Sequence, residues 1–209
     1  MRCHRFENNL FGSPYRVQLQ LHITMIASRV FRSLKTPVSQ RTCQRNMAAA
    51  ALSQVEEKIK ALGLKLPEPA VPKGNFSLFT RVGNIAYISG HLPQPMGKPL
   101  IVGKVGKDLT VEQGYEAAKY AGLNLCATIK ANVGSLDKVR KIVKITAHVN
   151  GVDGFSQQPA VVNGCSELLG KVFDQEKVGY HARCSVGVNG LPLGVPIQIE
   201  AIVELDPEV

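Results

Sequence analysis

Two charged residues near the C-terminal end of the chain could do chemistry together. Arg183 lies in a strand-like segment at 181–186, and Glu200 lies in another at 197–203, with a Gly/Pro turn between them. Each segment alternates apolar and polar residues with the period of two that is typical of half-buried strands. We therefore expect a hairpin that brings both side chains to one place. A guanidinium can bind a carboxylate with its planar fork, and a nearby carboxylate can orient a water for attack.

The alternation also predicts which side chains face the core. Cys184, Val186 and Val188 form the apolar face of the first segment, so we interpret Cys184 as a small buried apolar group and not as a nucleophile. Arg183 and Ser185 share the opposite face. An ordinary ion pair, or two solvated side chains on an exposed sheet face, would also fit the Arg/Glu pair.

Signatures of other chemistries are missing from the sequence. It contains no GxxxxGK[ST] phosphate loop, GxGxxG, GxSxG elbow or HExxH. His91, His148 and His181 are far apart and have no acidic partner at metal-ligand spacing, so we expect no zinc site, and structural roles for these histidines. The five cysteines show no CxxC spacing and indicate free thiols in a reducing compartment. Cys126 and Cys165 are expected to be buried on helices.

The order of strands and helices expected around this pair predicts an α+β domain. It has one mixed sheet with two main helices on a single face. In the strand at 138–149, alternation places Val143 on the same face as Ile145; in the last strand it groups Ile197, Ile199 and Ala201. The expected elements are strands at 76–82 and 84–90 around a Gly83-Asn84 turn, a helix at 110–133 capped by Thr110 and Gln113, a strand at 138–149, a helix at 156–173, and the final pair of strands.

The positive charge of the chain is concentrated at its N-terminal end. Residues 1–46 hold eight of the 25 basic residues and one of the 16 acidic residues. The other 163 residues hold 17 basic and 15 acidic residues, so the domain is nearly neutral, which argues against nucleic-acid binding. No apolar run approaches the roughly 20 residues that span a bilayer, so we expect no membrane segment.

The first 73 residues are expected to precede the domain proper. Basic residues between Ile26, Val30 and Leu34 predict that 1–46 is a transit peptide or disordered leader, mitochondrial, with a plastid as the alternative. Translation from Met47 would instead give a cytoplasmic protein. Residues 47–73 are predicted to form an N-terminal helix, capped at Ser53, and a Pro-rich connector, and 74–209 to form the domain.

Over residues 50–206 the sequence resembles the RidA/YjgF family, which is also labelled L-PSP endoribonuclease. The extra N-terminal helix is similar to the longer YjgF-like branch of that family. The resemblance rests on Val82-Gly83-Asn84, Ile88-Ser89-Gly90-His91-Leu92-Pro93, Val162-Asn163-Gly164, His181-Ala182-Arg183-Cys184-Ser185-Val186, Leu191-Pro192 and Ile199-Glu200-Ala201-Ile202.

This resemblance implies a chorismate-mutase-like fold, a homotrimer with clefts between subunits, and no metal or organic cofactor. It also implies hydrolysis of reactive small enamine and imine acids to 2-keto acids and ammonia. Arg183 would bind the substrate carboxylate and Glu200 would orient the water. Ser89 and Asn163 would line the cleft.

Two departures from the family pattern bear on this expectation. Phe76 stands in the substrate site where the deaminases carry a tyrosine, so a hydroxyl is lost. Ser185 replaces a cleft cysteine beside Arg183, and His181 is new there; this histidine could tune the pH dependence or be an exposed structural residue. A non-catalytic small-carboxylate-binding or assembly trimer is therefore the alternative to deamination. RNA cleavage ranks third, because the chain lacks a basic stripe and stacked aromatics.

Overall fold

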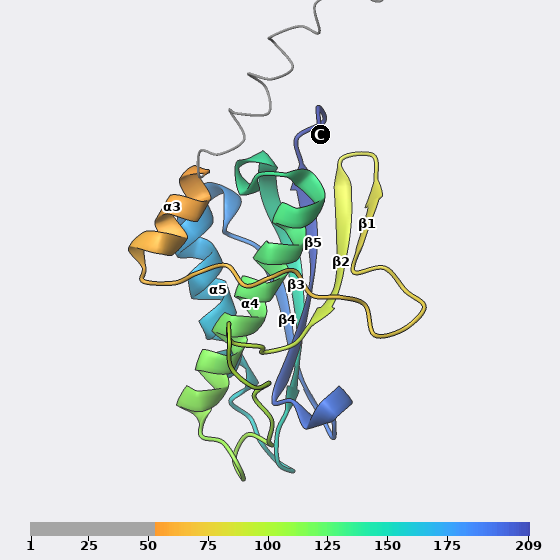
Figure 1. The fold of residues 1–209 in the computed structure, drawn as a ribbon. Coiled ribbons are helices and arrows are strands. Elements are labelled where there is room, and N and C mark those ends of the chain that lie inside the picture. Colours follow the sequence, from red (N-terminus) through yellow and green to blue (C-terminus); the bar gives the residue numbers. More distant parts are fainter. Residues whose placement is uncertain (1–52) are drawn as a thin grey trace, which may run out of the picture. The chain divides into compact units, whose positions relative to one another are not determined.

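The structure, a computed structural model, describes residues 53–209. The predicted leader and the first residues of the predicted N-terminal helix lie outside this range. Five strands form one mixed sheet in the order β1-β2-β5-β3-β4, as Figure 1 shows. The strands are β1 (Phe79–Val82), β2 (Ile85–His91), β3 (Val139–Asn150), β4 (Ala182–Val188) and β5 (Ile197–Leu205).

Helices cover one face of this sheet and leave the other open (Figure 1). Helices α4 (Val111–Val133) and α5 (Gln158–Phe173) pack on the sheet and on each other, and α3 (Gln54–Ala61) packs on α5. The predicted one-sided α+β fold is therefore confirmed, although the helices are shorter at their N-terminal ends than predicted. Within residues 53–209, no helix is both long enough and apolar enough to cross a membrane.

The caps of the helices agree with the sequence prediction. Thr110 and Gln113 form a reciprocal capping box at the start of α4, which pairs two backbone donors that the helix leaves open. The hydroxyl of Ser53 accepts from the Glu56 backbone N–H at 3.1 Å and so caps α3. The Asp137 carboxylate adds a cap from far along the chain, because it accepts from the backbone N–H groups of residues 54 and 55. This contact fixes α3 against the domain.

The core lies between the helices and the covered face of the sheet. On β5, Ile197, Ile199, Ala201, Val203 and Leu205 are all buried, as the alternation predicted. On β3 the prediction was wrong at one position. Bulges shift the register between Val139 and Lys141 and again between Ile142 and Lys144, so Ile142 fills the core and Val143 is 38% exposed. A bulge inserts one residue, and strict alternation fails across it.

The expected hairpin between the last two strands is absent. Strand β3 lies between β4 and β5, pairing parallel with β4 and antiparallel with β5. The reason is the crossover: α5 connects β3 to β4, and a strand–helix–strand unit places its second strand parallel to the first. The Gly/Pro segment at 189–196 then carries the chain past β3 to β5.

Candidate functional site

Arg183 is held by two side chains of helix α5. Its Nη1 atom donates to Asn163 Oδ1 at 2.8 Å and to Ser166 Oγ at 3.1 Å. Asn163 and Ser166 are three residues apart on α5 and therefore lie on the same face of that helix. Of the two partners, Asn163 was predicted as a site residue, and the structure brings it to Arg183 as expected.

The other edge of the guanidinium is open. Among the described residues, Nε and Nη2 of Arg183 make no hydrogen bond, and the residue is exposed. An arginine has five N–H donors in a rigid plane, and two parallel donors on one edge match the two oxygens of a carboxylate. The arrangement therefore fixes one edge to the protein and presents the other to solvent.

His181 lies directly behind this cluster. Its Nε2 is 3.1 Å from Ser166 Oγ, and its Nδ1 is 2.6 Å from the Gly179 carbonyl oxygen. Burial lowers the pKa of His181, and the nearby charges of Arg183 and Lys141 lower it further, against the opposing effect of the bond to Gly179. The residue is half-buried and hydrogen-bonded at both nitrogens, so it is not an exposed structural histidine.

Ser166 contacts Arg183 and His181 and was not among the predicted site residues. Two spacings in the sequence could have pointed to Ser166. Asn163 and Ser166 are one helical turn apart, and His181 and Arg183 are two residues apart on an extended segment, so each pair shares a face. What the sequence could not show is that these two faces meet.

Ser185 shares the face of Arg183, as predicted. It pairs with Ala147 of β3, which is buried against the helices. Its hydroxyl oxygen is buried and has no hydrogen-bond partner among residues 53–209. A buried hydroxyl without a partner is uncommon in proteins, and Ser185 is the neighbour of Arg183 with an unused hydrogen-bonding group.

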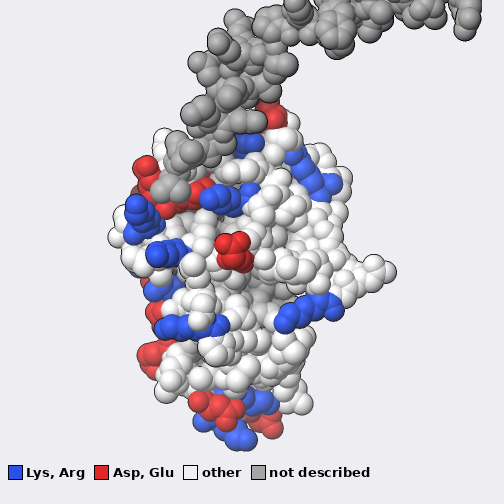
Figure 2. Space-filling view, in the orientation of Figure 1, with Lys and Arg blue, Asp and Glu red and all other residues white. Residues whose placement is uncertain are grey.

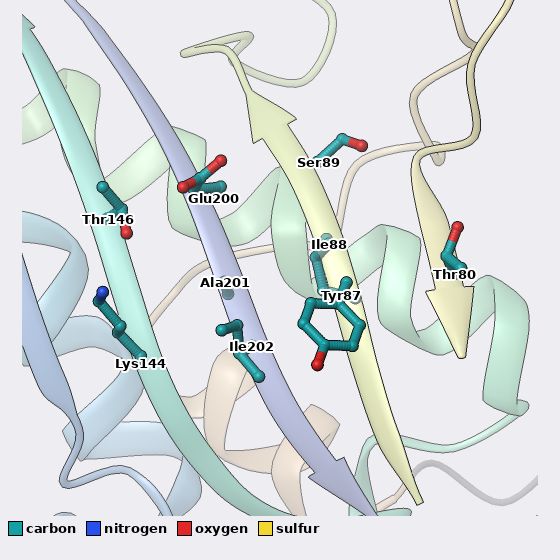
Figure 3. A pocket seen from close by; sticks show the side chains of 9 residues that line it. All are labelled: Thr80, Tyr87, Ile88, Ser89, Lys144, Thr146, Glu200, Ala201 and Ile202. Carbon is teal, nitrogen blue, oxygen red and sulfur yellow. The ribbon is translucent and has the colours of Figure 1, made fainter. Parts of the chain in front are cut away.

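Glu200 lines a separate hollow on the open face of the sheet. The hollow measures about 300 Å³ and includes Ser89, Thr146 and Tyr87. Figure 3 shows the Glu200 carboxylate on β5 between Thr146 of β3 and Ser89 of β2. Glu200 is exposed, and its carboxylate makes no hydrogen bond within the described part of the chain. Glu200 could therefore hold a water.

A bulge in β2 places Ser89 beside Glu200. The pairing shifts between Ile88 and His91, so Ser89 and Gly90 together oppose Glu200. The bulge lets Ser89 stay on the open face while His91 points into the core, where it contacts Thr128 Oγ1 at 2.7 Å. Bulges of this kind re-aim side chains near active sites. The predicted structural role of His91 is confirmed.

Arg183 and Glu200 do not meet within one chain. Arg183 pairs with Ile145, which pairs with Ala201 on β5, whereas Glu200 pairs with Thr146. Directly paired residues point to the same face of a sheet, and the next residue points to the other. Arg183 therefore faces the helix layer at the edge of the sheet, and Glu200 faces the open side, so the prediction that a hairpin brings them together was wrong.

Cys184 corrects the prediction for strand β4 in the same way. It pairs with Thr146, on the open face, and is only partly buried. The sequence does alternate along β4, but β4 is an edge strand and its apolar residues face away from the helices. Cys126 and Cys165 are buried as predicted, and burial raises the pKa of the Cys165 thiol to about 12. Within residues 53–209, no cluster of three His, Cys, Asp or Glu side chains could hold a metal ion.

Phe76 lies in neither cluster but lines a nearby apolar cavity of about 480 Å³. Leu193 lines the same cavity with a left-handed backbone (φ 58°), which is rare for a leucine. Gly90 and Gln198 form the side next to Glu200, since Gly90 follows Ser89 and Gln198 is two residues from Glu200 on the same face. Gln198 occupies the space that a Cβ on Gly90 would need. The cavity therefore adjoins the Glu200 hollow.

The open face of the sheet carries exposed apolar side chains. Tyr87 is 50% exposed and pairs with Ile202, and Val186 is 38% exposed and pairs with His148. Val143 on β3 is equally exposed. Several exposed apolar side chains on one sheet face mark a surface that another protein could cover. We call this region, formed by Tyr87, Val143, Val186 and Ile202, the open-face patch.

Comparisons with known proteins place this fold in a family. A family model described as "YjgF/chorismate mutase-like, putative endoribonuclease" matches residues 56–205. Protein TCP17 of Trypanosoma cruzi is 38% identical over 160 residues, which are 77% of this chain and 99% of that protein.

Two solved structures share both sequence and fold with this chain. Atu1372 from Agrobacterium tumefaciens, a protein of unknown function, is 38% identical with a TM-score of 0.67, and the match covers 73% of this chain and 94% of that one. A structure from Shewanella oneidensis MR-1 that carries the endoribonuclease description is 31% identical with a TM-score of 0.70, covering 73% of this chain and all of that one.

Proposed function

From the premise that this chain belongs to the YjgF/RidA family, we propose that it hydrolyses reactive small 2-imino and enamine acids to 2-keto acids and ammonia. The substrate carboxylate binds Arg183, and Glu200 orients the attacking water. The two residues come from different copies of the chain. The resemblance to the family's deaminases supplies the reaction type, and the geometry around Arg183 supplies the substrate class.

The observation that carries the proposal is the orientation of the Arg183 guanidinium. Asn163 and Ser166 hold Nη1, and the Nε–Nη2 edge makes no hydrogen bond among residues 53–209. An arginine on an edge strand would otherwise lose side-chain entropy on binding, and ordering it beforehand removes part of that cost. The preformed edge suits a small planar carboxylate.

Hydrolysis at the second cluster needs one water and one proton shuttle. Glu200 accepts a proton as the water adds to the imine carbon, and the proton passes to nitrogen. In the carbinolamine that results, Glu200 takes the hydroxyl proton and passes it to the amino nitrogen. The carbon–nitrogen bond then breaks, ammonia leaves, and the oxygen of the water becomes the keto oxygen. A carboxylate that makes no hydrogen bond to residues 53–209 is available to act as this general base. Enamines enter after they tautomerise to imines.

The separation of the two clusters supports an assembly of copies as part of the proposal. The Arg183 cluster lies at the β4 edge and the Glu200 hollow lies on the open face, so in the proposed site a second copy supplies the missing half. The open-face patch is a surface that such a copy would cover. A homotrimer with closed symmetry, as the family resemblance implies, would build three equivalent sites from these halves.

RNA cleavage is less well supported than deamination. The described domain shows acidic and basic side chains interleaved on the face in Figure 2, without a continuous basic stripe. Binding of an RNA backbone relies on clustered Lys and Arg. The single ordered arginine of the site fits one carboxylate better than a polyanion.

The test is an assay of keto-acid formation from enzymatically generated 2-aminoacrylate. Removing the fork in Arg183→Ala should lower kcat/KM about 30-fold or more, since one partner of a charged hydrogen-bonded pair is worth at least 2 kcal/mol. Arg183→Lys keeps the charge but loses the parallel N–H donors, so its kcat/KM should lie between those of the wild type and Arg183→Ala. Arg140→Ala is the matched control, because Arg140 is exposed and its ion pair within residues 53–209 is with Asp206, away from the site.

Two results would change the conclusion. Equal activity of the wild type and Arg183→Ala would refute the role of Arg183. Binding of 2-oxobutanoate without turnover of any imino acid would leave the alternative, a non-catalytic carboxylate-binding assembly. The absence of a phenolic hydroxyl at Phe76 is the feature of this chain that favours that outcome.

A further inference from the structure

The hydrogen bonds behind Arg183 have a direction that the geometry fixes. His181 Nδ1 lies 2.6 Å from the Gly179 carbonyl oxygen, and a carbonyl can only accept. In a neutral imidazole, Nδ1 therefore carries the proton and Nε2 is an acceptor. The Ser166 hydroxyl, 3.1 Å from Nε2, must donate to it. The lone pairs of Ser166 then face Arg183 Nη1, which donates at 3.1 Å.

The surroundings of His181 favour this neutral form. The ring is partly buried against Ser166 in the middle of α5, just before the start of β4, and its charged neighbours are the cations Arg183 and Lys141. The Nζ of Lys141 is itself tied to the Lys177 carbonyl. No carboxylate contacts the ring among the described residues. Burial and two cations both oppose a positive charge on the imidazole.

We propose that His181 is a positioning residue, which acts through Ser166 to hold the Arg183 guanidinium with its Nε–Nη2 edge toward the substrate carboxylate. This inference rests on the proposed carboxylate-binding role of Arg183. His181 does not touch the substrate itself. Its contribution is to fix the Ser166 hydroxyl as an acceptor for Arg183.

The physical reason for such a device is the freedom of the two side chains. A serine in a helix can turn its hydroxyl to donate to a carbonyl of its own helix, and its lone pairs then leave Arg183. The acceptor at His181 Nε2 holds the hydroxyl in the other orientation. Arg183 is on an edge strand and exposed, and among the described residues its guanidinium is hydrogen-bonded by Asn163 and Ser166.

The test is a double-mutant cycle that uses 2-oxobutanoate as the probe and isothermal titration as the readout. His181→Phe removes the acceptor and keeps a ring, and Ser166→Ala removes the link. Each should raise Kd about fivefold to tenfold, and the double variant should be no weaker than Ser166→Ala, because the two residues act in series. His181→Gln supplies a carbonyl acceptor and should return Kd to within about twofold of the wild type.

Nitrogen NMR of the full-length protein gives a readout that does not depend on a ligand. The wild-type His181 ring should show a protonated Nδ1 and an unprotonated Nε2, and the Arg183 Nε–H should become more mobile in His181→Phe. A protonated Nε2, or additive losses in the double variant, would overturn the inference. If no probe binds the wild type, the proposed function fails, and the NMR tautomer and Arg183 mobility still decide the positioning role.

Discussion

Arg183 and Glu200 lie on opposite faces of the same sheet, separated by strand β3. Arg183 is in register with Ile145 and Glu200 with Thr146, so one side chain meets helix α5 and the other meets the open face. Arg183 is hydrogen-bonded by Asn163 and Ser166, whereas Glu200 lines the hollow on the open face. A site that uses both must form between copies of the chain.

The open-face patch should be the contact through which copies assemble. Val186→Glu would place a charge in an apolar interface, which costs several kcal/mol when the charge is buried without a partner. We expect this variant to shift the mass measured by light scattering toward the monomer and to lose activity. Val102→Glu, at a loop position that is 55% exposed, is the matched control. An assembled Val186→Glu protein, or a monomeric wild type, would contradict the account.

The cavity lined by Phe76 and Leu193 should favour substrates with larger apolar side chains. It adjoins the Glu200 hollow, so imino acids derived from leucine or methionine should be hydrolysed with higher kcat/KM than 2-aminoacrylate. Leu193→Asn should lower the ratio of these kcat/KM values about tenfold, which is the effect expected when one or two apolar groups no longer contact the substrate. Asparagine tolerates the left-handed backbone at this position, so the fold should be retained.

Met96→Gln is the control for this substitution, because Met96 and Leu193 are 56% and 57% exposed and Met96 does not line the cavity. It should leave the substrate preference unchanged. Equal kcat/KM values across the substrate series would show that the cavity has no part in selectivity.

Acid should destabilise the protein through His91. Burial lowers the pKa of this histidine below its ordinary value of 6.5, although its bond to the Ser89 carbonyl acts in the opposite sense. Below pH 6.5 this histidine becomes protonated in the unfolded chain but stays neutral in the folded chain. The free energy of unfolding therefore falls as the pH falls. Urea titrations between pH 5 and 8 should show this slope, and His91→Gln should flatten it. An unchanged slope in His91→Gln would rule out His91 as the cause.

Much of the fold could be predicted from the sequence, because its signals are local. The capping box at Thr110 and Gln113 and the buried alternation on β5 depend on residues close in the chain. The position of β4 depends on a pairing with β3 across helix α5, which no local pattern encodes. The error at Val143 has a similar origin, since the position of a bulge depends on the pairing with the neighbouring strand and not on the local pattern.

The candidate site was predictable in its parts and not in its arrangement. Arg183, Asn163, Ser89 and Glu200 each stand in a motif that carries the family resemblance. Their division into two clusters follows from the strand order, and strand order is a long-range property. The hydrogen bonds that Ser166 makes with His181 and Arg183 could not be predicted for the same reason, because they require a face of α5 to meet the start of β4.

Mixing two inactive variants tests the central claim most directly. Arg183→Ala and Glu200→Gln should each be inactive in the imino-acid assay. When they are unfolded together, refolded and assayed at equal concentrations, roughly a quarter of the sites in a closed symmetric oligomer should combine an intact Arg183 with an intact Glu200 from the neighbouring copy. Activity near that fraction of the wild type is the predicted result. A mixture as inactive as its components, in protein shown to have exchanged subunits, would contradict a site shared between copies.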